Sequence, residues 1–186
     1  MKLALRGAAM LLAASLGQSA LAANFSFTGL GSGTTGSYSM TNDGITLTVT
    51  TPTSGRQVAY SNSGFGAKGG FLDSSKLDSG EALTFSFSQE VTIGSATLNG
   101  WGTIGDSADL GGISASCAIL CSLSTDVSLG ALGGITSLTV TNNGAALLSS
   151  FTVGALSNVQ AVPLPAASWL FLSGLLGLAG RKRLSR

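Results

Sequence analysis

The sequence predicts an all-β fold, an antiparallel β-sandwich of jelly-roll-like type that occupies residues 23–160. Three observations predict it. Apolar and polar side chains alternate in several short runs, no long stretch has the 3.6-residue period of an amphipathic helix, and turn sequences with glycine separate the runs. With 186 residues, the chain has room for one such domain between two terminal segments.

The alternating runs are clearest at residues 45–50, where Ile, Leu and Val alternate with Thr and so lie on one face of a strand. Residues 83–87, 91–93 and 138–140 repeat the pattern. Their spacing predicts eight to ten short strands that form two packed antiparallel sheets. The aromatic side chains expected in the core are those of Phe25, Phe27, Phe85, Phe87, Phe151 and Trp101.

Four glycine-containing segments predict turns. Residues 42–44 and 142–144 read Asn-Asp-Gly and Asn-Asn-Gly between alternating runs, where tight hairpin turns are expected because these residues tolerate positive φ. Residues 64–70 and 111–112 are also rich in glycine, but no Gly-Lys-Ser/Thr follows as in a phosphate-binding loop. We interpret them as flexible turns.

The charge distribution separates the middle of the chain from its ends. All eight acidic residues lie between Asp43 and Asp126, and only three of the nine basic residues, Arg56, Lys68 and Lys76, share that region. Three positive against eight negative charges give the middle a net charge of about −5. This acidic balance argues against nucleic-acid binding, which needs cations that face phosphates.

The chain contains no histidine. Ser-His-Asp and Cys-His catalysis are therefore excluded, and the commonest ligand of catalytic zinc is missing. No catalytic residue and no metal ligand is predicted, and we interpret the chain as a protein that is not an enzyme.

The acidic residues leave three interpretations open. Asp73, Asp78 and Glu81 lie within nine residues with Lys76 among them, and Asp106 lies near Asp109. They are either solvated loop carboxylates, the oxygen ligands of a structural Ca²⁺ ion, or, for Asp78 and Glu81, the acid pair of a glycosidase. The spacing matches no EF-hand, which favours solvated carboxylates over a Ca²⁺ site. No cofactor is expected, and structural Ca²⁺ is the one alternative left open.

The first segment, residues 1–22, has the parts of a secretory signal peptide. Basic residues precede an apolar run, residues 7–16, which is too short to span a bilayer comfortably. Small side chains at Ala20 and Ala22 suit signal peptidase, so cleavage is expected between Ala22 and Ala23. The chain is thus expected to use the Sec translocon, with an uncleaved N-terminal anchor as the alternative.

Cys117 and Cys121 are the only cysteines. In an exported chain, two cysteines this close are expected to form a disulfide, and free thiols remain the alternative. The loop that such a disulfide closes is small, so its stabilisation is about 2 kcal/mol or less.

The last segment, residues 161–186, has three parts in order. A Pro-Leu-Pro element holds the backbone extended. The apolar run at residues 166–179 predicts a single transmembrane helix, and the basic end remains cytoplasmic. The motif residues are Val162, Pro163, Leu164, Pro165, Ala166, Ala167 and Trp169, and the basic tail is Arg181, Lys182 and Arg183.

This order of motif, apolar run and basic end resembles the PEP-CTERM sorting signal, in the variant that reads Val-Pro-Leu-Pro-Ala-Ala followed by Trp-Leu. The resemblance implies processing by exosortase, a membrane-embedded cysteine transpeptidase-like enzyme of bacteria that make extracellular polysaccharide. Leu164 replaces the Glu of the Pro-Glu-Pro motif, which implies a variant exosortase as the partner. A plain C-terminal membrane anchor is the alternative.

These segments predict how the protein is exported and where it is located. The resemblance implies an exported chain that is transiently anchored in the inner membrane and then reaches the cell surface or the extracellular matrix, associated with exopolysaccharide in a biofilm. The alternative is a carbohydrate-binding module, in which Trp101, Tyr38 or Tyr60 would stack on sugar rings.

Overall fold

A computed structural model describes residues 22–70, 73–101, 106–117, 124–130, 132–144 and 149–162. This part of the chain contains fourteen β-strands and no helix, and every strand pair in it is antiparallel. The predicted all-β antiparallel class is confirmed. The rest of the predicted signal peptide, residues 1–21, and the predicted transmembrane helix lie outside the described residues.

The number of strands is larger than the eight to ten predicted. Strands of two to four residues account for much of the difference, because they are too short to show alternation. The strands are β1 (Ala22–Ser26), β2 (Gly33–Thr35), β3 (Ser37–Asn42), β4 (Ile45–Thr50), β5 (Gln57–Ser61), β6 (Gly64–Lys68), β7 (Leu77–Asp78), β8 (Ala82–Thr92), β9 (Ser95–Asn99), β10 (Ser107–Leu110), β11 (Ile113–Ser116), β12 (Ser124–Ser128), β13 (Ile135–Asn142) and β14 (Ser150–Ala161).

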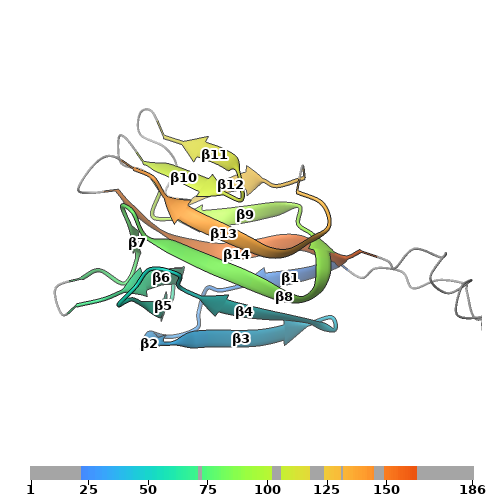
Figure 1. Ribbon diagram of the computed structural model, residues 1–186, viewed down its shortest axis with the longest axis horizontal. Coiled ribbons are helices and arrows are strands. Elements are labelled where there is room, and N and C mark those ends of the chain that lie inside the picture. Colours follow the sequence, from blue (N-terminus) through green and yellow to red (C-terminus); the bar gives the residue numbers. More distant parts are fainter. Residues whose placement is uncertain are drawn as a thin grey trace, which may run out of the picture. The chain divides into compact units, whose positions relative to one another are not determined.

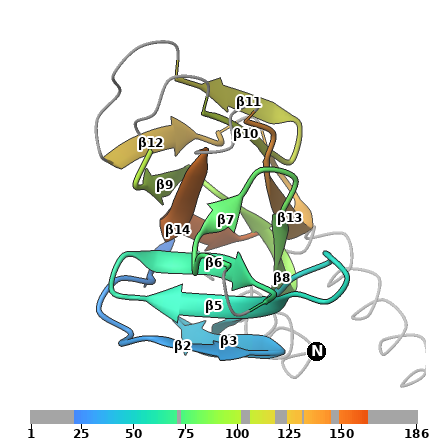
Figure 2. The same ribbon diagram turned by 90° about the vertical axis from the view of Figure 1, so that its left-hand side faces the viewer.

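The strands form two layers in a sandwich-like arrangement. The first layer has the order β3-β4-β8-β13-β10-β11 (Figure 1). In the second layer, β14 pairs with β9 on one side, and with β1 and β6 on the other; Figure 2 shows β12, β9 and β14 across from β8 and β13.

The sequence predicts two separate sheets, but hydrogen bonding joins the two layers into one sheet. The far end of β8 leaves the first layer and pairs with β14, so that Thr92 lies opposite Gln160. Hydrogen bonding therefore runs through all fourteen strands. β14 is the central strand of the domain, because it pairs with β1, β6, β7, β8 and β9.

Aromatic side chains fill the space between the layers. The ring of Phe27 lies 4.9 Å from that of Phe65 and 5.8 Å from that of Phe85, which belongs to the first layer. Trp101 meets Phe151 edge to face at 5.2 Å. The six aromatic residues predicted for the core are all buried, so this prediction is confirmed.

Two of the predicted turns are confirmed. β3 and β4 are joined by a two-residue turn, in which Asn42 pairs with Ile45 and the two residues between them have φ of 48° and 76°. Gly111 and Gly112 form the corresponding turn between β10 and β11, with φ of 64° and 93°. Both turns use the positive φ values that two-residue hairpins need.

The hairpin predicted at residues 142–144 is wrong. Asn142 is the buried last residue of β13, and β13 pairs with β8 and β10 rather than with the next strand, β14. The side chain of Asn142 donates to the carbonyls of Leu77 and Ser149 inside the domain, and its Oδ1 accepts from the Gly144 N–H.

The flexible turn predicted at residues 64–70 is wrong for its first five residues. Gly64–Lys68 is strand β6, and its first four residues are buried. A Cβ atom on Gly64 would lie 2.2 Å from the carbonyl oxygen of Val153, so the glycine permits β6 to approach β14 closely.

All described residues belong to one compact unit, Leu21–Val162. Its apolar side chains form a hydrophobic core within this unit. A stretch with a core of its own is able to fold by itself.

Candidate functional site

The boundary between the domain and its two predicted signals is formed by β1 and β14. Ala22 lies opposite Gln160, and Ala23 is fully buried opposite Val159. A peptidase needs an accessible, extended chain, so the Ala22–Ala23 bond can be cut only before β1 pairs with β14. The backbone N–H of Val162 donates to the carbonyl of Glu90 at 2.9 Å, so the ordered domain continues up to the predicted sorting motif.

Val162 is the one residue of the predicted sorting motif that the structure describes. Its other residues, Pro163, Leu164, Pro165, Ala166, Ala167 and Trp169, lie outside the described residues, as do Arg181, Lys182 and Arg183. Within the described ranges, the structure contains no helix of the length and apolarity that a membrane span requires.

Arg56 forms ion pairs with two of the clustered acidic residues, Asp73 and Glu81. Nε of Arg56 lies 2.9 Å from Oε1 of Glu81, and Nη1 of Arg56 contacts the carboxylate of Asp73. The backbone N–H of Gly69 also donates to Asp73. The loop before β5, the loop after β6 and the start of β8 are therefore held together by one guanidinium group.

Asp78 and Glu81 interact through the backbone. The N–H of Asp78 donates to Oε2 of Glu81 at 2.9 Å, and the hydroxyl of Ser74 donates to both carboxylate oxygens of Asp78 at 2.8 and 2.9 Å. Oε1 of Glu81 is fully buried and has its ion pair with Arg56 but no aligned hydrogen bond. Each polar contact of this group is internal, so the group connects loops of the domain.

The interpretation of these residues as solvated loop carboxylates is wrong for two of them. The Glu81 side chain is only 3% exposed, and Asp106 is 1% exposed. Sequence reasoning also missed Arg56, the partner of Glu81. The available signal was that Arg56 is one of only three cations in a middle with eight acidic residues.

No group of three or more Asp, Glu or Cys side chains in the described part of the chain is arranged to hold a metal ion. Asp73 and Glu81 instead share the positive charge of Arg56. A structural Ca²⁺ ion stays an alternative interpretation of these residues.

Burial raises the pKa of the Glu81 carboxyl above its ordinary value, although the N–H of Asp78 and the guanidinium of Arg56 act in the opposite direction. Burial likewise raises the pKa of Asp78, against the hydrogen bond from Ser74. In both carboxyls the loss of hydration outweighs the favourable partners.

These raised pKa values predict that acidification stabilises the domain. An acid with a raised pKa in the folded state stabilises it fully below the ordinary pKa, and this contribution is lost as the pH rises through the folded pKa. We expect the free energy of unfolding, measured with urea, to increase between pH 7 and about pH 4.5. Glu81→Gln should reduce this increase, whereas Glu90→Gln, at an exposed site, should leave it unchanged; equal slopes in both variants would contradict the prediction.

The outer face of the first layer is covered by hydroxyl groups. Pairs of them meet across strands: Thr41 with Thr46 at 2.9 Å, and Thr84 with Thr139 at 3.3 Å. Asp109, which lies opposite Thr141 in the adjacent strand β10, adds a negative charge to this face, and each hydroxyl can both donate and accept a hydrogen bond. The hydroxyl residues of this face are Ser37, Ser39, Thr41, Thr46, Thr48, Thr50, Thr84, Ser86, Ser137, Thr139 and Thr141.

One of the three aromatic residues proposed to stack on sugars cannot do so. Trp101 is 1% exposed and packs against Phe151, so its role as a sugar platform is corrected to that of a core residue. Tyr38 and Tyr60 are half-exposed, with ring centroids 5.5 Å apart and an angle of 55° between the rings. Stacking of these two tyrosines on a sugar stays a prediction.

Cys117 is buried, and none of the described cysteines is a free thiol. Its predicted partner, Cys121, lies outside the described residues. The disulfide between them therefore stays a prediction.

The chain matches no family model, and no curated protein and no solved structure is significantly similar to it.

Proposed function

We propose that this chain is an exported surface or extracellular-matrix protein that exosortase processes at its C-terminal tail. The observation that carries the proposal is the order of the Pro-Leu-Pro motif, the apolar run and the basic cluster within residues 162–183. Signal peptidase and the Sec translocon act on the first segment. The chain is the substrate of the sorting reaction and has no catalytic role in it.

The surface of the domain supports the proposed location in the extracellular matrix. Hydroxyl groups cover the outer face of the first layer, where Asp109 adds a negative charge, and the described basic residues Arg56, Lys68 and Lys76 lie outside that face. A hydrogen-bonding surface with few charges is compatible with a hydrated polysaccharide matrix, where exopolysaccharide is the proposed neighbour. The finer assignment of the fold, a jelly-roll-like sandwich, and the Cys117–Cys121 disulfide belong to the same proposal.

The predicted sorting motif begins directly after the last residue of β14, Ala161. Val162 is hydrogen-bonded to Glu90, and the motif continues at the next residue, Pro163. A peptidase that cuts in this motif therefore works directly beside a folded domain. Proline at residue 163 has no N–H and cannot extend the strand pairing, which favours an extended and accessible segment there.

Deletion of the exosortase gene in the producing bacterium is expected to leave nearly all of the protein full-length in the membrane fraction. Pro163→Ala combined with Pro165→Ala should have the same effect in wild-type cells, because the extended motif is lost. Ser168→Ala is the matched control and should be processed normally. The measurement is mass spectrometry of the C-terminus of the mature protein.

Two outcomes would contradict the proposal. Normal processing in the deletion strain would remove exosortase from it. A full-length chain in wild-type cells would instead support the alternative of a plain C-terminal membrane anchor.

A further inference from the structure

The free edge of β3 is the surface of this domain that is best suited to pair with another strand. β3 lies at the border of the first layer and pairs only with β4 among the described strands. Its register is unbroken from Ser37, opposite Thr50, to Asn42, opposite Ile45. An edge of this kind leaves alternate N–H and C=O groups without a strand partner.

β3 lacks the features that natural proteins use to protect edge strands. Such edges are commonly short or carry lysine, proline, a bulge or another charge. β3 is six residues long and reads Ser-Tyr-Ser-Met-Thr-Asn, with no charge, no proline and no bulge. Among the other described strands with a single partner, β2 has three residues, β7 has two and β11 has four, β1 has a bulge between Ala23 and Phe25, and β12 carries Asp126.

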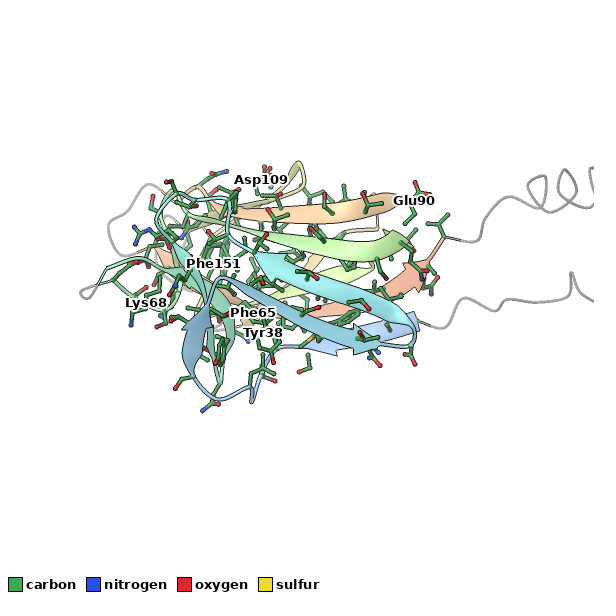
Figure 3. The ribbon with its side chains drawn as sticks, turned by 60° about the horizontal axis from the view of Figure 1, so that its bottom comes forward. Tyr38, Phe65, Lys68, Glu90, Asp109 and Phe151 are labelled. Carbon is green, nitrogen blue, oxygen red and sulfur yellow. The ribbon has the colours of Figure 1, made fainter. Side chains whose placement is uncertain are left out.

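The core-facing side of β3 is incompletely covered. Tyr38 and Met40 point toward the core and pack against it, yet both remain half-exposed. The ring of Tyr38 lies 5.0 Å from that of Phe65, and Figure 3 shows the two side by side behind β3. One further strand beyond β3 would cover the exposed parts of Tyr38 and Met40.

We propose that β3 pairs antiparallel with β3 of a second copy of this chain, centred on Ser39. In this register Ser39 lies opposite Ser39 of the second copy, and Tyr38 lies opposite Met40. Because side chains alternate with a period of two, this register keeps Tyr38 and Met40 of both copies on the core side. The contact is self-complementary and closes as a two-fold dimer. Because β3 carries no charge, pairing with an identical strand brings no like charges opposite each other.

The symmetry of this dimer fixes the direction of the two domains. Antiparallel pairing within one sheet needs a two-fold axis perpendicular to the layer, so the second domain is reversed. The β3–β4 turn lies at the same end of the domain as the end of β14 (Figure 1), and Asn42 bonds there to the carbonyl of Asn24. The Val162 ends of the two copies therefore point in opposite directions.

The dimer is tested with the domain alone, residues 23–162, by sedimentation velocity over a range of concentrations. We expect a reversible dimer. Ser39→Lys should raise the dissociation constant at least about tenfold, because two lysines then lie opposite each other. A mixture of the Ser39→Lys and Ser39→Glu variants should dimerise again, since residue 39 faces residue 39 across the axis.

Ser114→Lys is the matched control, because Ser114 is an exposed serine on the β11 edge. It should dimerise like the unmodified domain. A domain that is monomeric at its highest soluble concentration, a dimer that Ser39→Lys leaves intact, or a dimer that only Ser114→Lys disrupts would each overturn the inference. The tail is absent from this experiment, so these outcomes do not bear on processing, which the exosortase deletion tests separately.

Discussion

Replacement of Asn142 with aspartate is expected to lower the free energy of unfolding by about 3–5 kcal/mol. The Nδ2 group of Asn142 donates to the carbonyls of Leu77 at 2.8 Å and Ser149 at 3.1 Å, and Oδ1 accepts from the Gly144 N–H and the Ser149 hydroxyl. All hydrogen-bonding capacity of this amide is used in a site with no exposure. Aspartate would direct an oxygen at two carbonyl oxygens and add a buried charge.

Urea unfolding of the domain, residues 23–162, measures this loss. Asn143→Asp is the matched control, because Asn143 is the exposed neighbour and its change should stay within about 0.5 kcal/mol. Low pH should restore part of the stability of Asn142→Asp, since a protonated carboxyl can donate to one of the two carbonyls. Equal stability of the two variants at pH 7 would show that the network around Asn142 does not hold the domain together.

Substitution of Gly64 by alanine should cost about 3 kcal/mol or more. Gly64 has a φ of 128°, which side chains rarely adopt, and a Cβ there would lie 2.2 Å from the carbonyl oxygen of Val153. Backbone strain contributes about 1–3 kcal/mol and the overlap a similar amount. β6 would have to move away from β14, the strand that connects the two layers.

The control for this prediction is Gly44→Ala in the β3–β4 turn. Gly44 also has a positive φ, 76°, but no atom lies within 4 Å of an added Cβ. Only the backbone cost of about 1 kcal/mol is expected there. Thermal and urea unfolding of the two variants separate overlap from strain, and similar losses at both glycines would contradict the close approach of β6 to β14.

Residues 142–144 and 42–44 show where local sequence stops being informative. Both segments read as Asn followed by Asn or Asp and then Gly, and both predict a tight turn. Only residues 42–44 form a hairpin turn between two paired strands. Asn142 differs because its amide reaches the carbonyl of Leu77, which is 65 residues away in the chain. No window of neighbouring residues contains that partner.

Arg56 and Glu81 show the same limit for charged residues. An acidic residue in a turn-rich segment is usually solvated, and the neighbours of Glu81 in the chain do not indicate burial. The side chain is buried because the chain brings Arg56 to within 2.9 Å of it. Desolvation and an ion pair are set by this three-dimensional placement and not by residue type.

The sequence by itself determined which side chains face the core. Alternation with a period of two assigns each residue of a strand to one face, and this local rule predicted the all-β class and the buried aromatic residues. The Asn-Asp-Gly sequence at residues 42–44 predicted the turn between β3 and β4. The two terminal signals are predictions from the order and composition of their segments.

Only the tertiary structure decided which strands pair and what happens to polar groups between them. Pairing depends on contacts between distant parts of the chain, so the role of β14 as a common partner and the strand at residues 64–68 were not predicted. Glycine and asparagine occur both in turns and in closely packed strands. Which of the two a given residue adopts depends on contacts with residues of other strands.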